Sequence, residues 1–308
     1  MDPAVVAFGL GVGVLVGMTG IGGGSLMTPL LILVFGVKPI TAVGTDLAYG
    51  AVTKTVGGIK HLRQGTVDMS LSGWMALGSV PAAIGGVYVL ELLERAHGAE
   101  FDELLILLLA IALLVCGALT LARAVFLKQL HGRERATLEL ECRHKLAAVA
   151  LGVIVGFVLG VTSAGSGAII AVGLILLFRL VPTRVVGTDV FHAALLLWAA
   201  AIAHIASGNV DFALAGTILL GSVPGVWIGS SLSVRVPTDA LRTTLAIVLL
   251  GSGLGLLAKA GAGVPGWILA AFPVAVGALV GWVTLRDRRR NREQGRVAPG
   301  AVEQTGYG

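Results

Sequence analysis

The chain has 308 residues, of which 56% are hydrophobic and only 13% are charged. Its mean hydropathy of +0.93 leaves too little polar surface to cover a soluble globule. The composition therefore excludes an ordinary soluble protein and predicts one that spans a lipid bilayer. No lysine or arginine precedes the first apolar run, so we expect that run to stay as a helix rather than to serve as a secretory signal.

Eleven apolar segments follow one another along the chain. They cover residues 3–20, 25–37, 40–59, 69–90, 103–126, 146–163, 168–181, 185–206, 212–233, 240–258 and 264–285. A helix needs about 20 residues to cross the hydrocarbon layer, whereas the second and seventh segments offer only about 13 each. We expect these two segments to be the returning halves of hairpins or parts of broken helices.

The chain contains an internal repeat. A shift of 143 residues aligns Gly44-Thr45-Asp46 with Gly187-Thr188-Asp189, and His61, Gly65 and Asp68 with His204, Gly208 and Asp211. Duplicated helical bundles are a common construction of secondary transporters. The predicted organisation is a first transmembrane repeat (1–127), a charged cytoplasmic loop (128–145), a second transmembrane repeat (146–258), an extra transmembrane helix (259–285) and a basic cytoplasmic tail (286–308).

Loop charges predict how the segments are oriented. Basic residues outnumber acidic ones in the loop of residues 128–145 and crowd the tail, which we interpret as a cytoplasmic anchor rather than a nucleic-acid site. Each repeat holds five segments, an odd number, so we expect the second repeat to be inverted relative to the first. Three crossings per repeat, with each short segment returning as a hairpin, would keep this inversion, whereas four would remove it.

Glycine-rich polar runs precede both short segments. Glycines allow a break in a helix, and the unpaired N–H groups, together with the positive end of the next helix dipole, favour an anion. Close packing of glycine-rich helices is the alternative. The candidate substrate-binding residues in these runs are Thr19, Gly22, Gly23, Gly24, Ser25, Thr162, Ser163, Gly165, Ser166 and Gly167.

Two acids and one lysine lie within apolar segments. Asp46 and Asp189 are equivalent, and each either caps free N–H groups or carries a proton, because desolvation disfavours a charged carboxylate. Lys54 follows Asp46 by eight residues and so lies on a similar helix face. A lysine at this depth is costly unless it pairs or meets an anion. Its counterpart in the second repeat is Leu197.

The pattern His-x-x-x-Gly-x-x-Asp begins at His61 and again at His204, and it ends at Asp68 and Asp211. One interpretation is a structural turn, in which the glycine ends one helix and the aspartate caps the next. The other is a gate or a proton entry that uses the histidine. A metal site is weakly supported, because inverted repeats would place the two copies on opposite membrane faces.

Together these motifs resemble the sulfite/organosulfonate exporter family of the TauE/SafE type. The resemblance rests on Gly22-Gly23-Gly24 with Pro29, on Ala42-Val43-Gly44-Thr45-Asp46, on Thr53-Lys54, and on His61 through Gly65 to Asp68. The second repeat is more degenerate, with Val172 in the place of Pro29. The resemblance implies a multi-pass inner-membrane protein that moves small sulfur-containing anions and is coupled to an ion gradient.

We therefore expect an all-α polytopic membrane protein that acts as a secondary transporter, not an enzyme, and exports sulfite or organosulfonates. Lys54 would supply positive charge to the substrate site, and Asp46 or Asp189 would carry the coupling proton. We expect no cofactor, no metal and no nucleic acid; the partners are a small anionic substrate and the bilayer, and a homodimer is left open. The alternatives are an anion channel, a transporter of another small solute, a membrane-embedded metal-dependent enzyme and a regulatory subunit.

Overall fold

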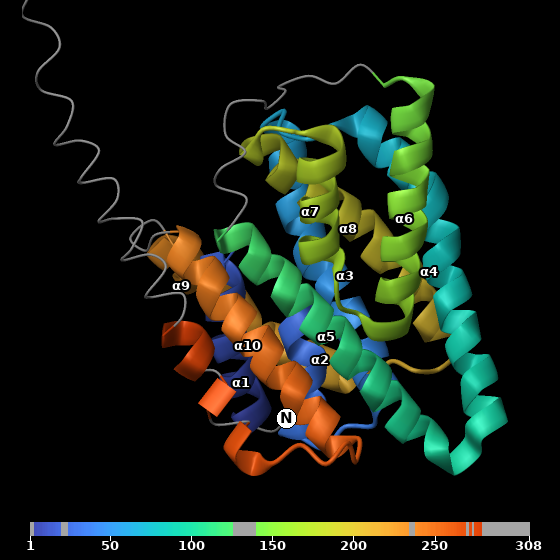
Figure 1. Ribbon diagram of the computed structural model, residues 1–308, viewed down its shortest axis with the longest axis vertical. Coiled ribbons are helices and arrows are strands. Elements are labelled where there is room, and N and C mark those ends of the chain that lie inside the picture. Colours follow the sequence, from blue (N-terminus) through green and yellow to red (C-terminus); the bar gives the residue numbers. More distant parts are fainter. Residues whose placement is uncertain are drawn as a thin grey trace, which may run out of the picture.

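Helices form the framework of the protein (Figure 1). The structure is a computed structural model, and it describes residues 3–19, 24–125, 140–233, 238–268, 271–272 and 274–278. No strand occurs among these residues, which confirms the predicted all-helical fold. In chain order the helices are α1 (Pro3–Thr19), α2 (Gly24–Leu33), α3 (Pro39–Arg63), α4 (Met69–His97), η1 (Gly98–Glu100), α5 (Phe101–Val125), α6 (Cys142–Thr162), α7 (Ser166–Phe178), α8 (Pro182–Ala206), α9 (Phe212–Ser233) and α10 (Thr238–Lys259).

Five helical stretches in the described part of the chain are long and apolar enough to cross a membrane. They are Met69–His97, Phe101–Arg123, Cys142–Thr162, Pro182–Ala206 and Phe212–Gly229, and three further apolar helices are shorter. Helix α3 is as long as α8, at 25 residues, but it carries more charged side chains. The chain is thus a membrane protein with several apolar helices.

Helices α3 and α8 begin earlier than their apolar segments predict. Each starts at a proline, Pro39 or Pro182, which is favoured in the first turn because it has no N–H group to satisfy there. Asp46 and Asp189 therefore lie about two turns inside their helices, where the backbone N–H groups are already paired. Capping of these helix starts, one of the two interpretations of the acids, is thereby excluded.

Two pairs of helices pack closely in parallel, α4 along α6 and α1 along α9. A Cβ atom on a glycine of α6 or α9 would overlap the facing backbone, so the close approach requires glycine. Gly152, Gly156 and Gly160 face Met75, Ser79 and Ala83, whereas Gly221, Gly225 and Gly229 face Val6, Leu10 and Val14. Residue numbers rise together along both helices of each pair, so the two pairs run parallel.

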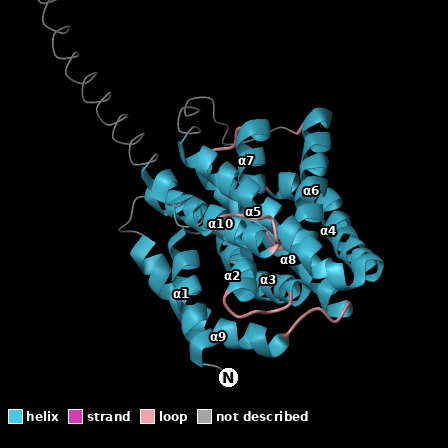
Figure 2. Cartoon of the chain, turned by 60° about the horizontal axis from the view of Figure 1, so that its bottom comes forward, coloured by secondary structure: helices cyan, strands magenta, loops and turns pink. Residues whose placement is uncertain are grey.

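Two other pairs run antiparallel, α3 with α8 and α5 with α10. Along α3, glycines at 44, 50 and 57 face residues 204, 197 and 190 of α8, so one numbering rises as the other falls. Gly117 faces Leu250 and Gly253 faces Leu114 in the same sense. Helices α5 and α10 lie side by side in both Figure 1 and Figure 2.

Helix α7 turns back along α6 (Figure 1). Gly165 at the start of the returning segment lies against Val158, and Gly173 lies against Leu151 further back along α6. In the first half, the Phe8 ring of α1 packs edge-on against Phe35, just after α2, with ring centroids 4.9 Å apart. Helix α7 therefore returns toward the start of α6, whereas α2 packs mainly against α3 and α10.

Several predicted segments fall outside the described residues. These are most of the charged loop and the whole basic tail, and only parts of the predicted last helix are described. The charged segment 128–145 ends in helix rather than loop, because α6 begins at Cys142. The internal repeat and its inversion remain predictions.

Candidate functional site

The break between α6 and α7 is a tight turn. Ser163, which follows the last residue of α6, has a φ of 57°, and Gly165 has a φ of 104°. Thr162 holds the turn, because its hydroxyl donates to Val158 O and accepts from the Ala164 N–H. Ser166 and Gly167 begin α7, so the first N–H groups of that helix have no partner within the helix. Every predicted residue of the second glycine-rich run thus belongs to one turn.

Ser163 brings this turn into contact with the first half of the chain. Its hydroxyl donates to the carboxylate of Asp46 in α3 at 2.9 Å and lies 2.6 Å from the hydroxyl of Thr28 in α2. Thr28 also donates to Asp46, at 2.7 Å. A predicted substrate-binding residue and a predicted proton carrier therefore share one buried hydrogen-bonded cluster.

Thr28 was not singled out from the sequence, although a signal was present. It is the one hydroxyl residue in the apolar run 26–37, and it lies one turn after the predicted Ser25. Ser25 itself is half-buried in the first turn of α2. Thr19 ends α1 and Gly24 begins α2, whereas Gly22 and Gly23 lie outside the described residues.

Lys54 lies in the interior of the protein with a side chain that is only 6% exposed. Its ammonium group has no hydrogen-bond partner within the described residues, and neither does Oδ1 of Asp189. The two side chains attract each other electrostatically across the crossing of α3 and α8. At the equivalent position of the second half, Leu197 packs against Gly50.

Tyr49 and His192, which occupy equivalent positions, are both fully buried. The two ring nitrogens of His192 lie 3.3 Å from the Ser72 hydroxyl and 3.1 Å from the Ser79 hydroxyl of α4. The Tyr49 hydroxyl interacts with the Ser222 side chain of α9. The interior thus holds several polar groups, and among the described residues buried side-chain atoms without a hydrogen-bond partner occur in both halves.

Each predicted His-Gly-Asp turn binds the start of a helix from the other half. The Asp68 carboxylate accepts from Leu71 N–H at the start of α4, and the Asp68 N–H donates to the Thr188 hydroxyl of α8 at 2.9 Å. Similarly, Asp211 caps α9 through Leu214 N–H and donates its own N–H to Thr45 of α3 at 3.0 Å.

The two turns lie at opposite ends of the antiparallel α3–α8 pair, because one binds the start of α8 and the other the start of α3. Gly65 and Gly208 have φ angles of 68° and 74°, the left-handed conformation that favours glycine. His61 lies 3.0 Å from the Thr66 hydroxyl within its own turn, whereas buried His204 donates from Nε2 to Gly160 O of α6. The four His and Asp side chains are thus not brought together.

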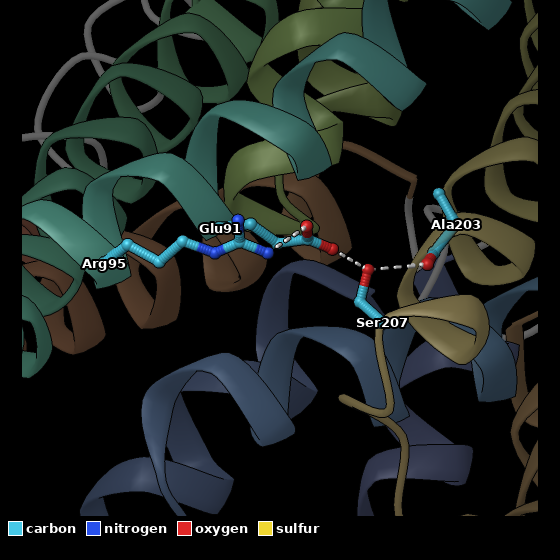
Figure 3. Close-up of polar contacts among 4 residues, drawn as sticks. All are labelled: Glu91, Arg95, Ala203 and Ser207. Carbon is cyan, nitrogen blue, oxygen red and sulfur yellow. Dashed lines mark hydrogen bonds and ion pairs between the residues drawn. The ribbon is translucent and has the colours of Figure 1, made fainter.

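A metal cluster of three or more His, Cys, Asp or Glu side chains does not occur in the described part of the chain. Figure 3 shows the contacts that Ser207, at the end of α8, makes just before the turn that leads to Asp211. Its hydroxyl donates to the Glu91 carboxylate of α4 and to Ala203 O, and Arg95 lies 4.0 Å from Glu91. At the other turn, Arg184 lies 3.8 Å from Asp68. Ionic contacts therefore accompany both turns.

Comparison with known proteins identifies the family. Residues 5–256 match the model of the sulfite exporter TauE/SafE family. The "Probable membrane transporter protein YjnA" of Bacillus subtilis (strain 168) is 40% identical over 257 residues, which cover 83% of this chain and 100% of that protein. The "Probable membrane transporter protein YdhB" of the same organism is 29% identical over 80% of this chain and 96% of its own length. No solved structure matches. The chain therefore belongs to the TauE/SafE sulfite exporter family of membrane transporters.

Proposed function

We propose that this protein is a proton-coupled secondary transporter that exports small anions, with sulfite or organosulfonates as its substrates. The observation that carries the proposal is the buried Lys54 ammonium group, which has no hydrogen-bond partner in the described part of the chain. A cation without a hydrogen-bond partner inside a membrane protein is expensive and marks a pathway for a charged solute. Asp189 attracts Lys54 without a hydrogen bond, and a transported anion supplies the missing hydrogen-bond acceptors.

In this proposal the two halves are inverted repeats. Under the shift of 143 residues, α1 to α5 correspond to α6 to α10, so the parallel pairs α1–α9 and α4–α6 become equivalent to each other. A two-fold axis in the membrane plane makes each helix antiparallel to its counterpart. The antiparallel pairs α3–α8 and α5–α10 support this relation, and the returning α7 keeps the number of crossings odd.

The substrate site lies where the two glycine-rich breaks face the α3–α8 crossing. Free N–H groups at the starts of α2 and α7 and the hydroxyls of Thr19, Ser25 and Ser166 donate to the oxygens of a sulfite or sulfonate group. Lys54 contributes the positive charge. The contact of Ser163 with Asp46 supports the meeting of the second break with α3.

The coupling proton binds to Asp46 or Asp189, which are buried and lie on the two antiparallel helices. Asp189 also neutralises Lys54 when no anion is bound, so a proton on Asp189 favours an anion at Lys54. The turns that contain His61 and His204 act as gates at the two ends of the pathway. The protein resides in the inner membrane, with its basic tail in the cytoplasm as the positive-inside rule requires.

Reconstitution into proteoliposomes tests the proposal. Sulfite, thiosulfate, sulfoacetate, taurine and sulfate are offered in turn, with and without an imposed pH gradient. We expect flux of at least one sulfur-containing anion that rises with the gradient. Flux that ignores the gradient would indicate an anion channel, and no flux with any of the five anions would refute the substrate assignment.

A further inference from the structure

Three oxygen atoms from both halves of the chain meet beside the α6–α7 break. They are Thr28 Oγ1 of α2, Asp46 Oδ2 of α3 and Ser163 Oγ after α6, and they are separated by 2.7, 2.9 and 2.6 Å. All three residues are buried, with at most 2% of their surface exposed. Each distance lies within the range of an O–H···O hydrogen bond. The three contacts therefore form a closed ring.

The ring requires three protons, one for each contact. The hydroxyls of Thr28 and Ser163 supply one each. An ionised Asp46 only accepts hydrogen bonds, so if both hydroxyls donate to it, the 2.6 Å contact between them holds no proton and is repulsive. A protonated Asp46 supplies the third proton, and the three O–H groups then donate in one direction around the ring.

Besides the two hydroxyls, the Thr28 backbone N–H favours a negative charge on Asp46, but no cation pairs with this carboxylate among the described residues. Its second oxygen, Oδ1, is buried without a partner in the described part of the chain. On α3, Tyr49 is uncharged and Lys54 lies two turns away, where it is attracted to Asp189. The charged and titratable groups of the neighbouring helices have partners other than Asp46. On α8, Arg184 lies beside Asp68, Asp189 interacts with Lys54 and with Arg123 of α5, His192 contacts Ser72 and Ser79, and His204 donates to Gly160 O and interacts with Glu91. Asp211, just before α9, caps that helix. A buried carboxylate without a paired cation costs several kcal/mol.

We propose that the Thr28–Asp46–Ser163 ring is a proton-binding site and that the bound proton fastens the α6–α7 break of the second half to α2 and α3 of the first. Loss of this proton leaves one of the three contacts without a hydrogen. When both hydroxyls donate to the carboxylate, that contact is the one between Thr28 and Ser163, so these two residues separate and the break is released from α2. The ring thereby assigns Asp46, rather than Asp189, as the acid that controls the position of the break. The inference depends on the proposed function only for the claim that this release accompanies transport.

A bound cation is the competing explanation, and the spacing of the oxygens argues against it. Metal–oxygen distances of about 2.3–2.6 Å in a roughly octahedral site separate neighbouring ligand oxygens by more than about 3.2 Å. The three observed separations are all shorter than this. They match hydrogen bonds, and the ring would have to expand to accept a metal ion.

Infrared spectroscopy of the full-length protein in lipid nanodiscs tests the assignment. A protonated carboxyl group has a C=O stretching band that a carboxylate lacks. We expect the Asp46→Asn protein to lose one such band at neutral pH, and the Asp189→Asn protein to keep it. Ser163→Gly and Thr28→Ala should shift the same band, because each removes one hydrogen bond from the ring. Both replacements occur at the equivalent positions of the other half, Gly20 and Ala171, so the fold is expected to accept them.

These measurements test the proton-binding ring and the proposed transport function independently of each other. Identical carboxyl bands in the wild-type and Asp46→Asn proteins at neutral pH would overturn the proton assignment, and so would an unshifted band in both ring variants. Thermal stability in sodium chloride and in choline chloride tests for a bound cation. If sodium chloride stabilised the wild-type protein more than choline chloride did, and Asp46→Asn showed no such difference, the ring would be a cation site and the proton assignment would be wrong. The expected band together with no anion flux in proteoliposomes would retain the ring and refute the proposed function.

Discussion

Removing the hydroxyl of Thr188 should destabilise the protein more than removing the equivalent hydroxyl of Thr45. Both threonines are fully buried, and each accepts one hydrogen bond from a backbone N–H of the opposite half. The donors differ in burial, because Asp68 is only 9% exposed whereas Asp211 is exposed to solvent. In Thr188→Val the Asp68 N–H loses its partner without gaining water. In Thr45→Val, water can reach the Asp211 N–H.

The expected magnitudes follow from this difference. A buried donor left unsatisfied costs about 1–3 kcal/mol, whereas a hydrogen bond that water can replace costs about 0.5–1.5 kcal/mol. The measurement is the free energy of unfolding of each valine variant in detergent micelles or bicelles. Thr120→Val is the matched control, because Thr120 is buried in α5 but donates only to Cys116 O of its own helix.

The order of the losses in unfolding free energy among the three variants tests whether burial of the facing N–H sets the strength of these contacts. We expect the loss of stability to fall from Thr188→Val to Thr45→Val, with Thr120→Val the least affected. Equal losses at Thr188 and Thr45 would show that burial of the facing N–H does not control the strength of these contacts. A loss at Thr120 as large as at Thr188 would show that any buried threonine behaves in this way.

Three further predictions concern charge and packing. Lys54→Ala should abolish anion efflux in proteoliposomes while the protein still inserts into the membrane, and normal efflux would remove Lys54 from the mechanism. Asp46→Asn and Asp189→Asn should each lose the dependence of transport on pH, and an unchanged pH profile in both would leave the acids without a part in coupling. Gly156→Ala should destabilise the protein by about 1–3 kcal/mol through overlap of its Cβ with Ser79 of α4, measured as the free energy of unfolding. Gly73→Ala, where the new Cβ meets open space, should not destabilise, and equal losses would refute close packing as the cause.

Hydrophobic segments of the sequence located the helices well, because the composition of a membrane helix is set by the surrounding lipid along its whole length. The first ten predicted segments each coincide with one of the helices α1 to α10. Helix starts were less accurate, since prolines at 39 and 182 begin α3 and α8 before the apolar residues do. The start moved by one residue for α3 and by three for α8, and in the structure both acids lie beyond the first turn of their helices, where they cannot cap the helix starts.

The polar contacts were harder to predict because they join residues that are far apart in sequence. The hydrogen bonds from Asp68 to Thr188 and from Asp211 to Thr45 span 120 and 166 residues. Sequence repetition identified these motifs but not their partners. Thr28 was missed because its contact with Asp46 arises only when α2 packs against α3.

The repeated and unrepeated residues have different tasks in the proposed mechanism. The threonine contacts to the turns occur in both halves, at opposite ends of the α3–α8 pair, where alternating access requires each end to open and close in the same manner. Lys54 and Thr28 have no polar counterparts, because Leu197 and Ala171 replace them. Lys54 lies between the two ends and Thr28 lies beside Asp46 near one of them, and in the proposed mechanism the anion and the proton bind only once per cycle. In this proposal the repeated contacts allow the two halves to move in the same manner, whereas the unrepeated residues of α2 and α3 provide one cation for the substrate and one ring for the proton.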